Sequence, residues 1–362
     1  MKKAVSIILT VVLCLSTFVF ASAQTVDLNS LSFDELVTLA KQDGHVESVG
    51  MPGDWANWEA SWNYITNTYG ITHYDTDMTS AEELAVMKAE GANGTKDIGD
   101  VGHAFTTTVV DEGITQGYKP STWESIPDWA KDPEGRWIIS YTGTISFATN
   151  TTLTNGVVPT SWADLMDSKL NVSVGNVVAG ASSQAAVLSC AIAMGGGLDN
   201  VQPGIDYFKK LAEEGRLDPG DTNRERLANG EIVVCAGLYD YSSLAHRDAI
   251  NASDSGMKIE VTIPQDGAVT SGYALVFNAN APHPYATALT MEYMLSDQGQ
   301  IDRAYGYARP VRDVQLPADA QAMMLDASLY ANTTPITDVT QFSAACKQIA
   351  TLWEEEVIPS MY

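Results

Sequence analysis

Residues 262–312 read TIPQDGAVTSGYALVFNANAPHPYATALTMEYMLSDQGQIDRAYGYARPVR, and this stretch decides the fold. Residues 273–278 are short and mostly apolar, which predicts a strand, and the prolines that follow predict a turn. The apolar spacing of residues 285–295 predicts an amphipathic helix. A short polar helix comes next and ends at Gly306, a residue type that favours helix termination. We expect this strand–turn–helix–helix module to complete an α/β body.

The N-terminus has the composition of a secretory signal peptide. Lys2 and Lys3 precede an uncharged apolar run over residues 4–20, and residues 21–23 (Ala-Ser-Ala) are small enough for a cleavage site. The polar residues that follow favour cleavage after Ala23 over a membrane anchor. No later stretch is long and apolar enough to cross a bilayer. We therefore expect a free periplasmic protein.

The chain is strongly acidic, with 45 Asp and Glu against 20 Lys and Arg and a net charge of −25. Loss of residues 1–23 would remove two lysines and no acid, leaving 339 residues with a net charge of −27. This balance argues against nucleic-acid binding, which needs clustered basic side chains. Net charge favours solubility and does not report on the charge of a pocket. The length suits two lobes of ordinary domain size.

Three cysteines would remain after cleavage: Cys190, Cys235 and Cys346. An odd number cannot pair completely, even in an oxidising compartment. Cys190 lies in the apolar run AAVLSCAIAM and Cys235 in IVVCAGL, so both are expected in the core. No CxxC spacing occurs, and we expect no structural metal site and no cofactor.

Strand and helix patterns alternate along the chain, which favours a mostly parallel sheet covered by helices. The first series has a strand at 46–50, a helix that ends at Gly70, a helix opened by a capping box at Thr79, and a strand at 97–101. A long strand at 138–150 leads into the second series. That series is expected to contain a helix capped by Ser161, strands at 171–174 and 231–237, and helices at 182–194, 203–214 and 222–228.

Two α/β series between which the chain passes twice predict a hinged, two-lobed protein. The candidate crossovers are residues 141–150 and 265–273. We expect residues 24–142 and 273–310 to form lobe 1, residues 143–272 to form lobe 2, and residues 311–362 to form a helical segment that packs on both. One large α/β domain is the alternative. In such sheets, ligands bind beyond the carboxyl ends of the strands.

Seven segments occur in a specific order and spacing: VESVGMPGDWANW, ELAVMKAEGANGTKDIGDVG, YTGTISFATN, PTSWADLMDSKLNVSVGNVVAG, NGEIVVCAG, NAPHPYATALTMEYMLSDQGQ and GYARPVR. In that order they resemble the extracellular solute-binding proteins of the iron, polyamine and phosphonate branch. The resemblance implies the type II periplasmic binding protein fold, with two α/β lobes that close over one solute in the Venus-flytrap manner. It also implies a monomer that delivers its solute to an ABC permease driven by a cytoplasmic ATPase.

Ferric-binding relatives carry adjacent tyrosines shortly after the strand that corresponds to residues 230–237. Here the segment reads Tyr239-Asp240-Tyr241, so the two phenols are separated by a carboxylate. In an extended segment both tyrosines would point to one face and Asp240 to the other. Phenol and carboxylate oxygens suit a hard cation. Their spacing departs from the family pattern, which counts against iron.

Polyamine receptors need carboxylates for the ammonium groups and aromatic walls for the methylene chain. Trp55, Trp58 and the two tyrosines could form such walls, with Asp54 or Asp240 as the counter-charge. Packing at the hinge or in the core is an equally good interpretation of the two tryptophans. At the crossover strand, the Trp and Asp of polyamine receptors correspond here to Ser271 and Tyr273, which counts against a polyamine.

An oxyanion is the third candidate ligand. Gly180-Ala181-Ser182-Ser183 precedes an apolar helix, whose free amides and two hydroxyls suit an anion. The alternative is that Ser182 only caps the helix. These residues favour an anionic or zwitterionic organic solute, such as a phosphonate or a phosphate ester. The polyamine and the ferric ion remain alternatives.

The full set of predicted cleft residues draws on both series. It consists of Asp54, Trp55, Trp58, His103, Phe105, Thr106, Thr142, Thr144, Ala181, Ser182, Ser183, Tyr239, Asp240, Tyr241, Ser271 and Tyr273. No HExxH, GxSxG, GxxxxGK or GxGxxG pattern occurs, so we expect no enzyme. A periplasmic sensor that presents its ligand to a membrane kinase or chemoreceptor is the alternative from another class.

Overall fold

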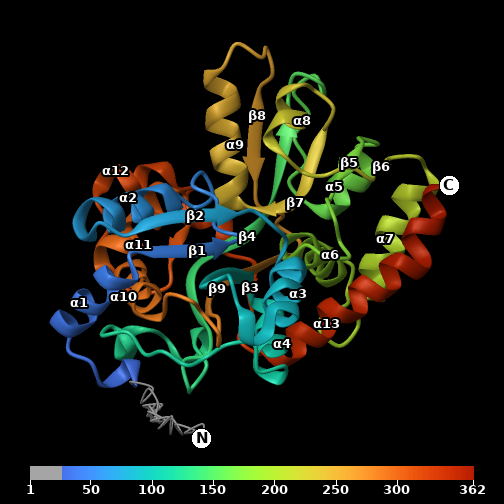
Figure 1. Cartoon of the computed structure of the whole chain (residues 1–362). Helices are drawn as coiled ribbons and strands as arrows, with labels where there is room; N and C mark the ends of the chain where they lie inside the picture. Colours follow the sequence, from blue (N-terminus) through green and yellow to red (C-terminus); the bar gives the residue numbers. More distant parts are fainter. Residues whose placement is uncertain (1–26) are drawn as a thin grey trace, which may run out of the picture.

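A computed structural model of the chain describes residues 27–362 (Figure 1). The predicted signal peptide and its cleavage site lie outside these residues. In the part of the chain that the structure describes, no helix is long and apolar enough to cross a membrane.

The strands join in one 11-stranded sheet whose main path is β2-β1-β3-β9-β4-β7-β5-β6. In its first part, β1 (His45–Val49) runs parallel to β2 (Thr72–Thr76) and to β3 (Ile98–Gly102). In its second part, β5 (Val172–Ser173) runs parallel to β6 (Leu217–Asp218) and to β7 (Val234–Tyr239). The two parallel groups match the prediction from alternating strands and helices.

Two long strands connect these groups. β4 (Ile138–Asn150) pairs with β9 (Ala268–Phe277) up to Thr144, and from Ile145 onward with β7 and β8 (Ile259–Thr262). β9 pairs in turn with β3 of the first group. The chain therefore changes from one sheet to the other within β4, which Figure 1 shows running between them. The expected crossover at 141–150 lies within β4, and the one at 265–273 begins three residues before β9.

Helices cover both parts of the sheet. In the first part they are α1 (Phe33–Asp43), α2 (Trp58–Tyr69), α3 (Ser80–Glu90), α4 (Thr106–Asp111), α10 (Pro284–Met294) and α11 (Asp297–Tyr305). In the second part they are α5 (Trp162–Asp167), α6 (Ala181–Ala193), α7 (Gln202–Glu213), α8 (Arg224–Ala228) and α9 (Asp240–Ala252).

The predicted helix ends are confirmed where a cap defines them. Thr79 and Glu82 form the capping box of α3, and the Ser161 side chain accepts the Asp164 amide at the start of α5. Gly70 ends α2 in the left-handed conformation, and Gly306 follows α11. The module at residues 262–312 is confirmed as β9, α10 and α11.

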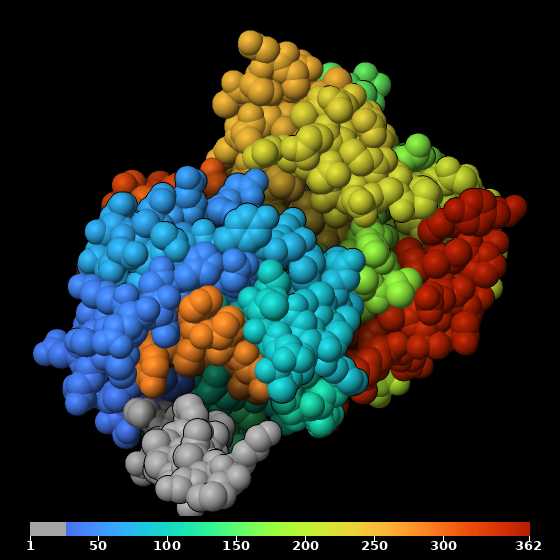
Figure 2. Space-filling view, viewed as in Figure 1, coloured from blue at the N-terminus to red at the C-terminus, as the bar shows by residue number. Residues whose placement is uncertain are grey.

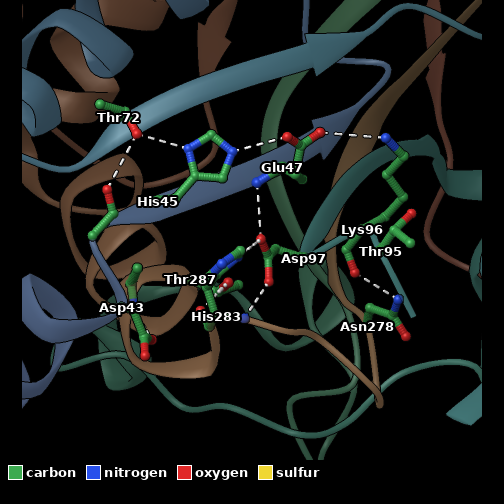
Figure 3. A network of polar contacts seen from close by, with 12 residues as sticks. Asp43, His45, Glu47, Thr72, Thr95, Lys96, Asp97, Asn278, His283 and Thr287 are labelled. Atoms are coloured by element: carbon green, nitrogen blue, oxygen red, sulfur yellow. Dashed lines mark hydrogen bonds and ion pairs between the residues drawn. The ribbon is translucent and has the colours of Figure 1, made fainter. Parts of the chain in front are cut away.

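The buried carboxylate of Asp97 forms hydrogen bonds that connect residues 262–312 to the first part of the sheet (Figure 3). The Asp97 side chain accepts the amide and the ring Nδ1–H of His283, at 2.7 and 2.8 Å, and the amide of Glu47 at 2.8 Å. Asn278, just beyond β9, donates to the carbonyl of Lys96 at 2.6 Å. These contacts join the starts of β1 and β3 to the turn between β9 and α10.

Residues 311–362 return to both parts of the molecule. β10 (Arg309–Pro310) lies just before them, and they contain α12 (Ala318–Met323), β11 (Thr333–Pro335) and α13 (Val339–Leu352). β11 pairs in parallel with the start of β9, and α13 extends from α4 past α6 towards α7 (Figure 1). The C-terminal segment thus makes a further connection between the two sheets, in addition to β4 and β9.

In local structure, one expectation is wrong, one alternative fails and two elements were missed. Tyr239 ends β7 and Asp240 begins α9, because an acidic residue is favourable in the first turn of a helix. The segment Tyr239-Asp240-Tyr241 is therefore not extended. The N-cap of α6 is Gly180, so Ser182 is not the cap. β2 and α9 were not predicted. The side chains of β2 are exposed or half-buried, so this edge strand lacks the apolar alternation that marks a strand in the sequence.

The cysteines behave as the sequence indicates. Cys190 and Cys235 have no exposed surface, and Cys346 is 2% exposed. All three are free thiols. They act as small apolar residues of the core.

Candidate functional site

A cavity of about 340 Å³ lies where the carboxyl ends of the strands of the two sheets face each other. Gly50 and Asp77, just beyond β1 and β2, line one side. Asn176, shortly after β5, and Thr222 line the other side, together with the start of α6. Figure 2 shows the two parts of the molecule meeting along a groove between the blue-to-cyan and the yellow-to-green residues. This is the place where open α/β sheets bind their ligands.

A buried carboxylate forms the floor on the first side. Glu83 of α3 is 1% exposed, and its Oε2 accepts the amide of Asp100 at 3.1 Å. A Cβ atom at Gly50 would lie 2.3 Å from Glu83 Oε1, and one at Gly99 would lie 2.6 Å from Oε2. The two glycines therefore make the room that the carboxylate occupies. Burial and the charge of Asp100 raise the pKa of Glu83 well above its usual range.

Asp100, in β3, lies beside Glu83 and is 1% exposed. Its Oδ2 accepts the hydroxyl of Tyr141 at 2.6 Å and the indole N–H of Trp58 at 3.3 Å. Among the described residues, its Oδ1 has no hydrogen-bond partner. Burial raises the pKa of Asp100 to about 7, against the opposing effects of the Tyr141 hydrogen bond and the Arg303 charge.

Aromatic rings form the base of the cavity. Trp55 donates its indole N–H to the Tyr141 hydroxyl at 2.9 Å, and its ring lies 5.6 Å from that of Tyr273. Tyr141 stacks on Tyr273 with 6.0 Å between centroids and meets Tyr241 edge-on at 5.4 Å. Tyr239 stacks on Tyr241 at 5.8 Å. Trp55 and Tyr273 reach the cavity, while Tyr141 and Tyr239 support them from behind.

The N-terminus of α6 forms the opposite wall. Its N-cap, Gly180, contributes no side chain, so no capping side chain accepts from the first amides of the helix. Ala181, Ser182 and Ser183 line the cavity there. A Cβ atom at Gly102, the last residue of β3, would lie 2.2 Å from that of Ala181. The absence of a side chain at Gly102 thus allows α6 to approach the first sheet.

The cleft continues past Trp55 into a second cavity of about 330 Å³. Tyr241 and His246 of α9 line it, with Asp54 and Arg224 at its rim. The Asp54 carboxylate lies 3.9 Å from the Arg224 guanidinium, and the side chain of Asp54 is 74% exposed. This ion pair connects the two parts of the molecule across the opening.

Seven of the predicted cleft residues are brought together by the structure. They are Asp54, Trp55, Ala181, Ser182, Ser183, Tyr241 and Tyr273, which line one or both cavities. Trp58 and Tyr239 do not reach either cavity. Trp58 is buried behind Asp100, and Tyr239 lies beneath Tyr241.

Three other predicted residues lie in the turn after β3 and at the start of α4, away from both cavities. His103 is buried, its ring 5.5 Å from that of Trp137, and burial lowers its pKa to about 4. Thr106 is buried and donates to the carbonyl of His103 at 2.8 Å. Phe105 lines a different cavity, between α3 and α13. The chain turns away from the cleft at Gly102, so these side chains point elsewhere.

The last four predicted residues lie in or beside the connecting strands. Thr142 is half-buried in β4 opposite Arg309, and Thr144 shares a hydrogen bond of 2.7 Å with Thr270. Ser271 is buried in β9. Asp240 accepts the hydroxyl of Tyr330 at 2.5 Å and the amide of Thr144 at 2.9 Å. Asp240 thus holds the connecting strand and lines neither cavity.

Sequence reasoning missed the carboxylates Glu83 and Asp100. The sequence could have indicated Asp100, because it lies in the middle of the apolar strand β3, where a charged side chain is buried and needs a partner. Glu83 follows directly on the capping box of α3, where an acid is expected at the exposed start of a helix. It lies next to Leu84 on a face that packs inward, which is unusual for an unpaired acid.

Residues 93–330 match a family model described as bacterial extracellular solute-binding protein. Among solved structures, the chain is similar to the periplasmic binding protein AfuA from Actinobacillus pleuropneumoniae, described with exogenous fructose-6-phosphate bound. The TM-score is 0.72 at 16% identity, over 86% of this chain and 98% of that one. It is also similar to the apo ferric ion-binding protein A from Pasteurella haemolytica, with a TM-score of 0.65 at 15% identity, over 86% and 97% of the two chains.

A third solved structure is titled Atu4243-GABA receptor, with a TM-score of 0.63 at 16% identity, over 85% of this chain and 96% of that one. At such identities these likenesses concern the fold, and they confirm the two-lobe type II architecture expected from the sequence. The family match extends the result to the kind of protein, because its members bind solutes and carry out no catalysis. The chain belongs to the bacterial extracellular solute-binding proteins.

Proposed function

We propose that this chain is the periplasmic receptor of an ABC importer and captures a small organic solute between its two lobes. It then delivers the solute to a membrane permease that a cytoplasmic ATPase drives. The observation that carries the proposal is the cavity of about 340 Å³, bounded on one side by the ends of β1, β2 and β3 and on the other by α6. Its volume suits a small ligand.

The proposed lobes are those expected from the sequence: residues 24–142 and 273–310 for lobe 1, residues 143–272 for lobe 2, and residues 311–362 as a segment that packs on both. The change of partner within β4, between Thr144 and Ile145, supports this division. Closure would bend the connecting strands and bring α6 towards lobe 1. We propose that the receptor acts as a monomer after cleavage following Ala23.

An organic solute, anionic or zwitterionic, agrees better with the cleft than a ferric ion does. Burial raises the pKa of Tyr239 and of Tyr241 well above the usual range, which opposes their use as phenolate ligands. The described residues contain no group of three or more His, Cys, Asp or Glu arranged to hold a metal. The start of α6 offers amides and hydroxyls to an oxyanion, and one structural neighbour is described with a phosphate ester bound.

A polyamine would need a carboxylate at each end of the cleft. Asp240, one of the two candidates from the sequence, lies behind Tyr241 and is engaged with Tyr330 and Thr144. Asp54 remains at the rim, where Arg224 faces it. The two carboxylates that the sequence offered for a polyamine therefore do not support that alternative.

Mass spectrometry of the solute released from the protein, purified from periplasm and then denatured, tests the proposal. A bound ligand stabilises the native state by mass action, so the released compound should raise the melting temperature when it is added back. No released solute, together with a flat melting temperature across a broad metabolite library, would overturn the receptor function. Uptake of the solute should also be lost in a strain that lacks the cognate permease. In a strain that lacks this protein, retained uptake together with lost chemotaxis would instead favour the sensor alternative.

A further inference from the structure

The cavity at the start of α6 is lined by acidic residues, four from the first part of the molecule and one from the second. Asp77, Glu82, Glu83, Asp100 and Asp221 line it, and no lysine or arginine within residues 27–362 does so. Surface acids can be left to solvent, but Glu83 and Asp100 are only 1% exposed each. Removing two neighbouring carboxylates from water is unfavourable unless a cation or donor compensates them. The lining therefore calls for a positively charged group in the cavity.

The unused acceptor of Asp100 indicates where that group would bind. Tyr141 and Trp58 both donate to Oδ2, and Oδ1, buried at the cavity wall, has no partner among the described residues. The guanidinium of Arg303 forms no hydrogen bond with Asp100, although its Nε and Nη1 have no partner among the described residues. It lies 3.7 Å over the Trp58 ring, and its Nη2 donates to the Asn57 carbonyl and the Ser61 hydroxyl. A buried acceptor without a donor is costly, so a ligand N–H is the natural partner of Oδ1.

The other walls agree with a ligand that carries both charges. Trp55 and Tyr273 present aromatic rings to the same cavity, and such rings attract an ammonium group. Across the cavity, the amides of Ala181, Ser182 and Ser183 lie in the first turn of α6, a helix of 13 residues. Amides at a helix N-terminus, with hydroxyls beside them, attract an oxyanion.

On the basis of the proposed receptor function, we infer that the solute is a small zwitterion with a primary ammonium group at one end and an oxyanion at the other. The ammonium donates to Asp100 Oδ1 and lies beside Glu83. The oxyanion accepts from the start of α6 and from the Ser182 and Ser183 hydroxyls. The two ends are thus held by different lobes, so one ligand draws the lobes together.

A matched set of four-carbon and related probes tests this assignment by calorimetry on ligand-free protein. The set consists of 4-aminobutyrate, 3-aminopropylphosphonate, putrescine, succinate and butyrate. The two amino-oxyanions should bind at least about 10-fold more tightly than butyrate, because only they fill both the Asp100 and the α6 sites. Tighter binding of 4-aminobutyrate would identify the oxyanion as a carboxylate, and tighter binding of 3-aminopropylphosphonate would identify it as a phosphonate.

The outcomes separate the inference from the receptor function. Equal or tighter binding of succinate, or specific binding of amine-free sugar phosphates alone, would overturn the ammonium assignment and leave the receptor intact. Tighter binding of putrescine than of both amino-oxyanions would overturn the oxyanion half. A protein that binds none of these probes and no compound of a broad metabolite library overturns both the inference and the receptor function.

Asp100→Asn tests the same site with little change of shape. The amide oxygen can still accept from Tyr141 and Trp58, whereas its NH₂ group replaces the acceptor Oδ1. We expect the amino-oxyanions to bind about 10- to 100-fold more weakly, with a circular dichroism spectrum like that of the wild type. Glu112→Gln is the control, because it removes the same charge at a partly exposed carboxylate that pairs with Lys88 at 2.9 Å, outside this cavity. Unchanged affinity in Asp100→Asn would overturn the inference.

Discussion

At the scale of single residues, the cleft depends on carboxylates that are buried without a salt-bridge partner. Asp100 and Glu83 are adjacent, and the pKa of each is raised by burial. Such groups destabilise the empty protein and become favourable only when a ligand compensates them. Unfavourable burial of this kind is common at functional sites. It lets ligand binding supply the free energy that closes the lobes.

The raised pKa of Asp100 predicts that the ligand-free protein loses stability as the pH rises. Asp100 keeps its proton in the folded state up to about pH 7, whereas the unfolded chain releases it near pH 3.8. Between these values the folded state binds more protons, so the free energy of unfolding falls with increasing pH, by up to about 4 kcal/mol. Burial causes most of the shift in the pKa of Asp100 and the charge of Asp75 adds to it, while Tyr141, Arg303 and Trp58 oppose it.

Urea denaturation at several pH values between 4 and 8 measures this slope. Asp100→Asn should have a smaller slope than the wild type and should be more stable than the wild type at pH 8. The Glu112→Gln variant serves again as the control and should keep the slope of the wild type. Identical slopes in the wild type and Asp100→Asn would contradict the assignment of the pH effect to Asp100.

Asp97, unlike Asp100, is a buried carboxylate whose hydrogen bonds stabilise the fold. It is fully buried and accepts three hydrogen bonds, two of them from His283. We expect Asp97→Ala to lower the free energy of unfolding by about 3 kcal/mol, because these donors lose their acceptor. Denaturant titration measures the change, and Asp34→Ala, at an exposed position, should leave the stability nearly unchanged. A change below about 1 kcal/mol would show that the network in Figure 3 contributes little.

At the scale of elements, β4 is the part that joins two sheets. Its residues up to Thr144 belong to one sheet and those from Ile145 to the other. Gly143 lies at this transition, packed against the rings of the second lobe. A Cβ atom there would lie 2.6 Å from Tyr241 Cε1 and 2.8 Å from Tyr239 Cβ. The connecting strand therefore requires a residue without a side chain at this position.

Gly143→Ala should lower the free energy of unfolding by about 1 to 3 kcal/mol, since the new methyl group overpacks the tyrosines. Denaturant titration again provides the measurement. Gly197→Ala is the control, because the nearest atom to a Cβ there is Asp199 Oδ1 at 3.4 Å, an ordinary contact. Equal stability of the two variants would mean that the tyrosine rings move aside without cost.

At the scale of the whole molecule, contacts at the rim connect the lobes. The hydroxyl of Tyr307, just after α11 of lobe 1, donates to Asp248 of α9 at 2.7 Å. The Asp54–Arg224 pair connects the lobes at another point of the cleft, with 3.9 Å between the charged atoms. Exposed contacts of this kind contribute little to stability. They can still favour the closed arrangement over the open one, because that balance is small.

Tyr307→Phe should therefore release the ligand about 3- to 10-fold faster, since one interlobe hydrogen bond contributes about 1 kcal/mol. Stopped-flow tryptophan fluorescence can follow the release, because Trp55 lies in the cleft. Tyr305→Phe is a matched control, for its hydroxyl bonds to Asp319 within the C-terminal part, at 3.0 Å. If both variants release the ligand at the same rate, the Tyr307 contact does not hold the lobes together.

The sequence by itself determined the class of fold and much of its local structure. Strand and helix periodicities, the capping box at Thr79 and the glycines at 70 and 306 act over a few residues, so they are visible in a linear chain. The order of seven segments was sufficient to identify the solute-binding family. The long strand at 138–150 was predicted with its exact ends, since it is rich in β-branched and aromatic residues despite the glycine at 143.

Only the tertiary structure decided which side chains form the cleft. Glu83, Asp100 and the start of α6 come from three distant segments, and their burial depends on glycines at positions 50, 99 and 102. The helix that begins at Asp240 also separated Asp240 from the cleft while leaving Tyr241 in it. Charge at a binding site depends on burial and on neighbours across the fold. Local periodicity does not reveal which distant residues will be neighbours or how deeply they will be buried. The acidic character of the cavity is therefore visible only in the folded chain.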